Sequence, residues 1–197
     1  MEKGINLKDT NNILINLAEA TNRLKDTKEI LDGLEIPFKR FDAIKHEKGL
    51  VGCGLSHLKL LSIIKPGTVI FEDDIGSMPN TTTRLLVPKE ADAVYLGVSN
   101  HGYIRNEPYG YGGVVMVAQH TPQWKRVLNM CSTHAILYLS DRYIKAAREV
   151  IMEYLNSSRA FDVGLASIHK DFNILTPNDP LFYQTEQPEF TKISLKV

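Results

Sequence analysis

Short apolar runs alternate with amphipathic stretches along the first part of the chain. Apolar runs at 12–17 and 68–73, and an alternating segment at 36–44, predict strands. Apolar residues at helical spacing over 22–34 and 55–64 predict two helices between those strands. The order strand, helix, strand, helix, strand is typical of an α/β fold. In such folds helices cover a sheet and ligands bind at the carboxyl ends of its strands.

The pattern is less regular in the second half of the chain. It predicts strands at 91–99 and 112–119 and an amphipathic helix over 141–158. A short helix is expected within 160–170, with Asp162 as its N-cap residue, and irregular structure rich in Pro, Asp and Gln follows. The sequence contains no internal repeat, low-complexity segment or linker, so we expect a single domain.

The composition is that of an ordinary soluble globular protein. Of 197 residues, 43% are apolar and 23% are charged, enough for one compact domain with a substantial core. Lys and Arg together number 23, as do Asp and Glu, so the formal net charge is zero. This balance argues against a protein that coats nucleic acid, because such proteins need a basic surplus. It leaves room for a small anionic ligand held by a few local groups.

The cysteine content and the N-terminal sequence both favour a cytoplasmic protein. Cys53 and Cys131 fit neither a disulfide framework nor a cysteine-based zinc site, so we expect two buried thiols in a reducing compartment. The opening MEKGINLKDT lacks the apolar run of a signal peptide. No stretch reaches the roughly 18 apolar residues of a membrane span, and none is expected.

Three consecutive acids, Glu72, Asp73 and Asp74, follow the apolar run of the third predicted strand. Alternate residues of an extended segment face the same side, so Glu72 and Asp74 are expected to point together and Asp73 away. Two converging carboxylates suit Mg²⁺ or Mn²⁺, with phosphate oxygens of a ligand completing the coordination. The structural alternative is that these acids cap a turn or lie solvated on a loop.

The motifs around these acids resemble those of the lipopolysaccharide-type glycosyltransferases, the family that includes the collagen galactosyltransferases. In that family a Gly-Cys-x-x-Ser-His helix start precedes a strand that ends in Glu-Asp-Asp. The matching residues here are Gly52, Cys53, Ser56 and His57, followed by Glu72, Asp73 and Asp74. Further segments that fit in the same order are INLAEATNR (15–23), FDAI (41–44), YLG (95–97) and YGYGGVVMV (109–117). The resemblance covers residues 13–120 well and the remainder weakly.

The resemblance implies a GT-A fold, an α/β fold with a mixed, mostly parallel central sheet flanked by helices, in a single domain over 1–197. A nucleotide-binding half would span about 1–100 and an acceptor-side half about 101–197. The implied activity moves a sugar from a nucleotide-sugar, with a UDP-sugar expected, to an acceptor hydroxyl on a glycan or glycoprotein. Mn²⁺ or Mg²⁺ would be the cofactor. In size the chain is similar to the small glycosyltransferase domains of chlorella viruses, which implies a virus-encoded enzyme acting in the host cytoplasm.

The resemblance also implies roles for particular residues. Asp74 and Glu72, in the Asp-x-Asp position, would bind the metal, and Asp73 would face the acceptor. If the reaction inverts the anomeric centre, the general base would be Asp162 or Asp73, whereas a retaining reaction would lack an obvious dedicated base. The donor nucleotide would be held by Asn16, Leu17, Ala18, Arg23, Asp42, Gly52, Ser56, His57, Glu72 and Asp73.

Most of these residues also have an ordinary structural interpretation. Arg23 is compatible with a solvated position on a first helical turn, Asp42 with a turn cap and Asp162 with a helix N-cap. A lone His57 on a helix is typical of a structural role. Weaker candidates for a third metal ligand or a substrate contact are His120, His134 and His169. Weaker candidates for stacking on a sugar are Tyr109, Tyr111 and Trp124.

Two other functions are compatible with parts of the pattern. A non-catalytic domain would keep this fold and bind a nucleotide or a partner, although the intact acid triplet argues against a decayed site. A Mg²⁺-dependent phosphohydrolase is disfavoured, because the first predicted strand, ILINLAEAT, lacks the nucleophilic Asp-x-Asp that such enzymes carry there.

Overall fold

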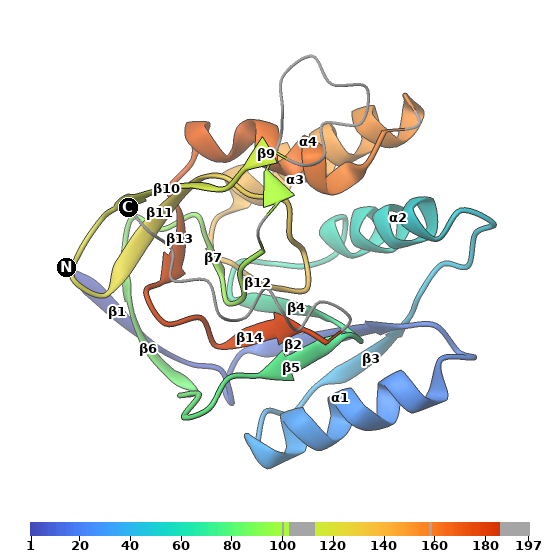
Figure 1. Ribbon diagram of the computed structural model, residues 1–197, viewed down its shortest axis with the longest axis horizontal. Coiled ribbons are helices and arrows are strands. Elements are labelled where there is room, and N and C mark those ends of the chain that lie inside the picture. Colours follow the sequence, from blue (N-terminus) through green and yellow to red (C-terminus); the bar gives the residue numbers. More distant parts are fainter. Residues whose placement is uncertain (100, 103–112, 158, 186–197) are drawn as a thin grey trace.

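The computed structural model describes residues 1–99, 101–102, 113–157 and 159–185, which form an α/β fold (Figure 1). This part of the chain contains four α-helices and a short 3-10 helix. They are α1 (Thr21–Gly33), α2 (Gly49–Leu61), α3 (Asp141–Asn156), α4 (Phe161–Ile168) and η1 (His169–Asp171). Among these described helices, none is long and apolar enough to cross a membrane.

An eight-stranded sheet forms the centre of the described chain, in the order β10-β11-β13-β7-β12-β4-β2-β3. Its strands are β2 (Asn11–Asn16), β3 (Lys39–Asp42), β4 (Thr68–Glu72), β7 (Ala93–Tyr95), β10 (Met116–Gln119), β11 (Trp124–Asn129), β12 (Ala135–Tyr138) and β13 (Ile174–Pro177). Both halves of the sequence therefore contribute strands to one sheet.

The sheet is mixed but mostly antiparallel, which corrects the expectation of a mostly parallel sheet. β2 pairs in parallel with β3 and β4, and β13 with β7, whereas the other four neighbouring pairs of this sheet are antiparallel. β12 lies between β4 and β7 and runs against both. Hydrophobic patterning did not reveal this, because it reports the face that a residue takes and not the direction of its strand.

Helices cover both faces of this sheet. α2, α3 and α4 lie on one face, and α1 lies on the other (Figure 1). Successive residues of β4 alternate between these layers: Ile70 packs in the core under α2–α4, whereas Val69 and Phe71 pack in the core that includes Leu31 of α1. Burial on both faces explains why β4 is a continuous apolar run in the sequence.

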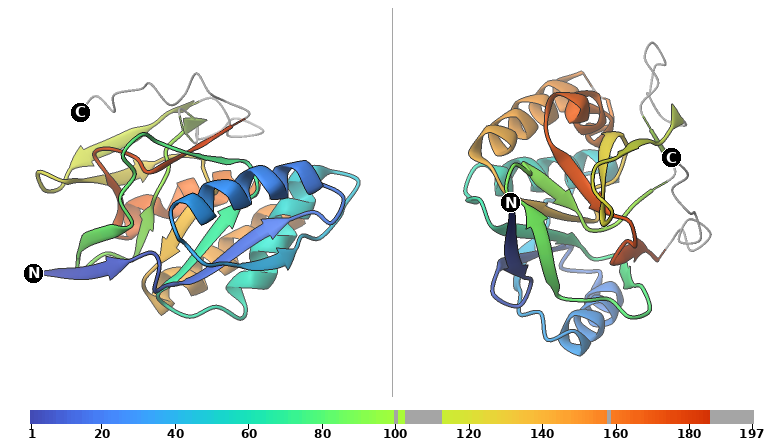
Figure 2. Two further views of the ribbon diagram at one scale, coloured as in Figure 1. Left: turned by 90° about the horizontal axis from the view of Figure 1, so that it is seen from below. Right: turned by 90° about the vertical axis from the view of Figure 1, so that its left-hand side faces the viewer.

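Small two-stranded sheets lie beside the central sheet in the described chain, and two of them extend the layer on the α1 side. The pairs are β1 (Glu2–Asn6) with β6 (Arg84–Pro88), β5 (Ile75–Ser77) with β14 (Phe182–Gln184), and β8 (His101–Gly102) with β9 (Gly113–Val114). Figure 2 shows β1 and β6 side by side at the end of the molecule that holds the N-terminus. Apolar residues of β1, β5, β6 and β14 belong to the same core as α1.

The connections between strands create a topological switch point at the carboxyl ends of β2 and β4. From β2 the chain passes through α1 to β3 on one side, and from β3 through α2 to β4 on the other side of β2. The two helices therefore lie on opposite faces of the sheet (Figure 1). In α/β sheets this switch point is where ligands bind, because the diverging connections leave a crevice between them.

α2 begins earlier than the pattern predicts, at Gly49 rather than near position 55. A Cβ at Gly52 would lie 2.5 Å from the carbonyl oxygen of Ile44, so glycine allows the helix to pack against the loop after β3. Gly54 packs in the same way against the ring of Phe161, at 3.0 Å from an added Cβ. The two glycines therefore lie inside the helix and serve its packing, whereas the sequence pattern had placed them before it.

Asp92, just before β7, is buried and holds three segments together. Its carboxylate accepts hydrogen bonds from Ser140 Oγ at 2.6 Å, from Arg142 Nε at 2.6 Å and from the backbone N–H of Asn173 at 2.9 Å. We expect Asp92→Asn to lower the free energy of unfolding at pH 7 by about 2–3 kcal/mol. The amide N–H groups of the new Asn would face the hydrogen-bond donors of Ser140, Arg142 and Asn173 in place of an acceptor. Urea unfolding of both proteins measures this difference.

The same pair of proteins tests the charge on Asp92. Burial raises the pKa of this carboxyl, but the hydrogen bonds from Arg142, Ser140 and Asn173 lower it below its ordinary value. A carboxyl with a lowered folded pKa stabilises the protein above its unfolded pKa, and that contribution is lost as the pH falls through the folded pKa. The difference between wild type and Asp92→Asn should therefore shrink below about pH 4. An equal difference at pH 7 and pH 3 would exclude a contribution from the charge.

Candidate functional site

A cavity of about 520 Å³ opens at the switch point between β2 and β4. Its lining comes from the end of β2 and the following loop, from α1, from the loop after β3, from the first turns of α2 and from the acids after β4. The lining residues are Ile15, Asn16, Leu17, Glu19, Arg23, Ala43, Ile44, Lys45, His46, Gly49, Leu50, Cys53, Glu72, Asp73 and Asp74. All of them lie within one stretch of 60 residues, from position 15 to position 74.

The three acids take their places because β4 ends at Glu72 and the chain then turns. Asp73 and Asp74 form the turn between β4 and β5. All three carboxylates line the cavity, whereas the sequence analysis expected Asp73 to point away. Thr27 Oγ1 of α1 donates to the backbone carbonyl of Asp73 at 2.9 Å and fixes this turn. The alternation of an extended strand does not apply to residues in a turn.

Asp73 faces β2 and α1. Asn16 Nδ2 donates to Asp73 Oδ2 at 2.7 Å, and Arg23 Nη2 lies 3.0 Å from Asp73 Oδ1. Burial raises the pKa of Asp73, and the Asn16 hydrogen bond and the Arg23 charge offset this only in part. Asp73 is therefore held on the side of the cavity that β2 and α1 form.

Asp74 is the least compensated of the three acids. Its Oδ2 accepts from Gln184 Nε2 at 3.2 Å and lies 3.4 Å from Arg23 Nη2. Its Oδ1 is buried and has no hydrogen-bond partner among the described residues. Burial, and then the negative charge of Glu72, raise the pKa of Asp74 to about 7.

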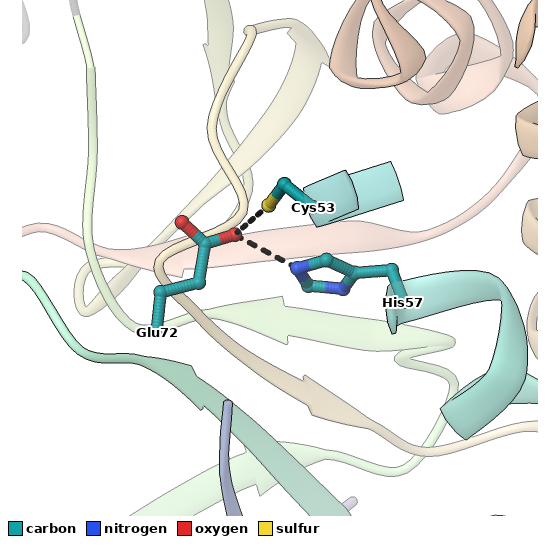
Figure 3. Close-up of side chains that lie close together, drawn as sticks. All are labelled: Cys53, His57 and Glu72. Carbon is teal, nitrogen blue, oxygen red and sulfur yellow. Dashed lines mark hydrogen bonds and ion pairs between the residues drawn. The ribbon is translucent and has the colours of Figure 1, made fainter. Parts of the chain in front are cut away.

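Glu72 is held from the other side by α2. His57 Nε2 lies 2.8 Å from Glu72 Oε1, and Cys53 Sγ lies 3.7 Å from the same oxygen (Figure 3). Burial raises the pKa of Glu72, but hydrogen bonds from His57 and Thr133 outweigh it, so the pKa lies below its ordinary value. Glu72 therefore keeps its negative charge next to Asp74.

This donor set fits a hard divalent cation. Three carboxylates line one cavity, and Arg23 is the cation paired with Asp73 and Asp74. The buried Oδ1 of Asp74, which has no hydrogen-bond partner among the described residues, is an oxygen ligand of the kind that Mg²⁺ and Mn²⁺ prefer. A cation held by Asp74 and Glu72 would offset the charge that the protein itself leaves uncompensated.

The end of β2 contributes both side chains and backbone to the cavity. Asn16 and Leu17 line it, whereas Ala18 does not. The carbonyl oxygens of Asn16 and Leu17 accept from the N–H groups of Ala43 and Ala20, at 3.0 Å each. These two carbonyls therefore position the neighbouring loops.

Ser56 and Gly52 support the cavity from behind. Ser56 Oγ accepts from the backbone N–H of Ile44 at 2.8 Å and donates to the carbonyl of Gly52 at 2.8 Å. Neither residue lines the cavity, but the loop that they hold, from Ala43 to His46, does. Their place in the structure is that of positioning residues.

Asp42 and Asp162 both lie outside the cavity lining. The Asp42 side chain is 79% exposed and pairs with Arg40 at 2.7 Å. Asp162 is the second residue of α4, whose N-cap is Ala160, and its Oδ1 accepts from the N–H of Val163 at 2.9 Å. Burial raises the pKa of Asp162 to about 6.

Asp162 nevertheless lies within electrostatic reach of the site. The negative charge of Asp162 contributes to the raised pKa values of Cys53 and Cys131. The negative charge of Glu72 in turn contributes to the raised pKa of Asp162. The burial of each group is the larger cause in all three cases. Asp162 is therefore a carboxyl close to Glu72 on the α4 side.

The weaker candidates that the structure describes do not line this cavity; they are His120, His134, His169 and Trp124. His134 is buried next to Glu72, and its carbonyl accepts the N–H of Glu72 at 2.9 Å. Tyr109 and Tyr111 lie outside the described residues.

The sequence did not indicate the cavity-lining residues Glu19, Lys45 and Leu50, or the contact of Gln184 with Asp74. Lys45 pairs with Glu19, and Leu50 is 51% exposed on the first turn of α2. The rule that ligands bind after strand ends would have indicated Glu19 and Lys45, which follow the first two predicted strands. Gln184, whose contact with Asp74 spans 110 positions, left no signal in the sequence.

Comparisons with known proteins give only distant structural likenesses. No protein-family model matches the chain, and no curated protein is similar to it. Among solved structures, a nucleoside-diphosphate-sugar pyrophosphorylase from Vibrio cholerae RC9 matches with a TM-score of 0.42 and 15% identity. The match covers 85% of this chain and 72% of that one. A likeness this distant carries no argument about activity.

Proposed function

We propose that the protein is a metal-dependent glycosyltransferase of GT-A type that transfers a sugar from a UDP-sugar to an acceptor hydroxyl on a glycan or glycoprotein. The observation that carries the proposal is Asp74, a buried carboxylate at the switch point whose Oδ1 has no partner among the described residues. With Glu72 and Asp73 beside it, the site holds an excess of negative charge. A divalent cation and the diphosphate that it neutralises complete such a site.

The cavity provides a role for each group around the donor. Asp74 and Glu72 would hold the cation, and Arg23, whose side chain is 42% exposed, would pair with the diphosphate through its planar guanidinium. Leu17 and Leu50 offer apolar surface to the nucleobase. When bound, Mn²⁺ or Mg²⁺ supplies Lewis-acid stabilisation of the charge on the departing UDP. Asp73 orients Arg23 and Asn16.

The proposal divides a single domain into two functional halves. Every lining residue of the cavity lies within 15–74, which supports a donor-binding half at about 1–100. Asp162 belongs to the second half, about 101–197, where the acceptor would bind. In an inverting reaction Asp162 would take the proton from the acceptor hydroxyl, and its raised pKa of about 6 suits a general base near neutral pH.

A panel of UDP-sugars tests the proposed activity. Release of UDP from at least one of them should require Mn²⁺ or Mg²⁺ and should be lost in Asp74→Asn. Asp162→Asn should retain UDP binding and lose transfer if the reaction inverts the anomeric centre. The alternative, a non-catalytic nucleotide-binding domain, predicts metal-dependent UDP binding with no turnover of any donor in the presence of candidate acceptors.

The structure distinguishes two charged residues that the sequence treated alike. Asp42→Ala is expected to leave UDP affinity within about twofold of wild type, because its exposed side chain lies outside the cavity. Arg23→Ala is expected to weaken UDP binding by about tenfold or more, because a charge-assisted contact to the diphosphate is lost. Calorimetric titration with UDP and Mn²⁺ measures both. Equal effects of the two substitutions would place the nucleotide elsewhere.

A further inference from the structure

Cys53, His57 and Glu72 bring three different metal-binding groups together beside the cavity. One ligand atom from each residue lies within 4.8 Å of the other two. The shortest separations are 2.8 Å between His57 Nε2 and Glu72 Oε1, and 3.7 Å between Cys53 Sγ and Glu72 Oε1. Figure 3 shows the three side chains pointing toward one another.

We infer that Cys53, His57 and Glu72 form a second cation site, selective for Zn²⁺, next to the proposed Mn²⁺ or Mg²⁺ site. A tetrahedral Zn²⁺ holds its ligand atoms about 3.5 Å apart, close to the 3.7 Å between Cys53 Sγ and Glu72 Oε1. The 2.8 Å between His57 Nε2 and Glu72 Oε1 would lengthen when the ion replaces the proton between them. A thiolate and an imidazole favour Zn²⁺, whereas Mg²⁺ and Mn²⁺ favour oxygen ligands alone. The donor set therefore distinguishes this site from one built on Asp74.

The ligands lie on elements that already hold them in place. Cys53 and His57 are four residues apart and share one face of α2, and Glu72 ends β4. Cys53 and Glu72 line the cavity, and His57 is fully buried behind them, so two of the three protein ligands face an opening. A water molecule or a phosphate oxygen in the cavity would supply the fourth ligand, as in zinc sites with an open position.

The proton balance of binding is simple. The Cys53 thiol releases its proton to solvent, and the thiolate, the Glu72 carboxylate and a neutral imidazole together neutralise Zn²⁺. In the metal-free site Nε2 carries the proton that it donates to Glu72 Oε1, so Zn²⁺ binding through Nε2 requires this proton to leave that nitrogen while the ring regains one at Nδ1. Nδ1 has no hydrogen-bond partner among the described residues, so no existing bond has to be broken for it to take the proton.

Zn²⁺ bound at this site would compete with Mn²⁺ or Mg²⁺ bound at the proposed nucleotide-sugar site, because Glu72 is a ligand in both. This consequence rests on the proposed function: Zn²⁺ should weaken Mn²⁺-dependent UDP binding in wild type, and Cys53→Ser should relieve the effect. The binding of Zn²⁺ itself does not depend on any nucleotide, so the two claims are separable.

Cobalt substitution tests the site directly. The protein, freed of metal with a chelator, should show a thiolate-to-cobalt charge-transfer band with one equivalent of Co²⁺, and Zn²⁺ should displace that ion. The band should be lost in Cys53→Ser and kept in Cys131→Ser, which removes the other thiol at a buried position outside the cluster. The dissociation constant for Zn²⁺ should rise about 100-fold in Cys53→Ser.

Two results would overturn the inference: no band in folded wild type, or an equal band in Cys53→Ser. Circular dichroism checks that each variant is folded. Alkylation of the wild type gives a test without any variant, because Zn²⁺ should protect Cys53 from iodoacetamide, and unchanged labelling of Cys53 would also contradict the site. A wild type that binds UDP with Mn²⁺ but gives no cobalt band would refute this inference alone. A wild type that gives the band but shows no Mn²⁺-dependent UDP binding would refute the proposed function alone.

Discussion

Asp74→Asn is expected to stabilise the unliganded protein at pH 8 by about 2–4 kcal/mol while abolishing its metal-dependent nucleotide binding. Burial and the charge of Glu72 raise the pKa of Asp74 to about 7 from an ordinary value of 3.8. A carboxyl with a raised folded pKa costs no stability below its unfolded pKa. Its cost grows as the pH rises and is complete above the folded pKa, at about 4 kcal/mol for this shift.

Urea unfolding at pH 5 and pH 8 measures this effect. The advantage of Asp74→Asn should be smaller at pH 5, where the folded carboxyl is protonated. Mn²⁺ should raise the stability of wild type and leave that of the variant unchanged. Asp42→Asn is the matched control, because it removes one negative charge from an exposed carboxyl. A variant less stable than wild type at pH 8 would mean that Asp74 is a structural ion-pair partner of Arg23 rather than an uncompensated ligand.

Gly97→Ala is expected to destabilise the protein by about 3 kcal/mol or more. A Cβ at Gly97 would lie 1.8 Å from His134 Nε2, and both residues are buried. The His134 ring cannot retreat without breaking its contact with Ser132 Oγ, at 2.8 Å from Nδ1. Because the carbonyl of His134 accepts the N–H of Glu72, the displacement should also weaken metal-dependent nucleotide binding.

A double mutant tests whether the clash with His134 causes the lower stability of Gly97→Ala. His134→Ala opens space at Gly97, so the double variant should be more stable than the sum of the two single effects predicts, by about 1 kcal/mol or more. Gly33→Ala is the control: it adds a Cβ with no atom within 4 Å and should be neutral or slightly stabilising in α1. Additive effects of Gly97→Ala and His134→Ala would exclude the steric explanation.

The position of the site was predictable because two simple patterns meet there. Two apolar runs and one alternating segment predicted the strands that became β2, β4 and β3, and the three acids lie at the carboxyl end of β4. Asn16, Leu17 and Arg23 line the cavity with Glu72, Asp73 and Asp74. Local sequence was sufficient for these residues, since each lies at the end of a strand of the βαβ units or shortly after it.

Other features depend on distant contacts. β12, β13 and β14 are strands of three or four residues, and such short apolar runs are not distinguished from helix or loop by periodicity. Asp42 shares the strand-end position of Asn16, but its pairing with Arg40 turns it to the surface. Gly52 and Ser56 lie behind the cavity lining, and their contacts with Ile44 depend on how α2 packs against the loop after β3.

The central claim is that the cavity between β2 and β4 binds a nucleoside diphosphate through a divalent cation. Calorimetric titration of UDP into wild type and Asp74→Asn, each with Mn²⁺ and with a chelator, tests it most directly. The account predicts binding in wild type with Mn²⁺, and affinity at least about tenfold weaker without the metal or in the folded variant. Equal UDP binding in all four titrations, or none in any, would contradict it.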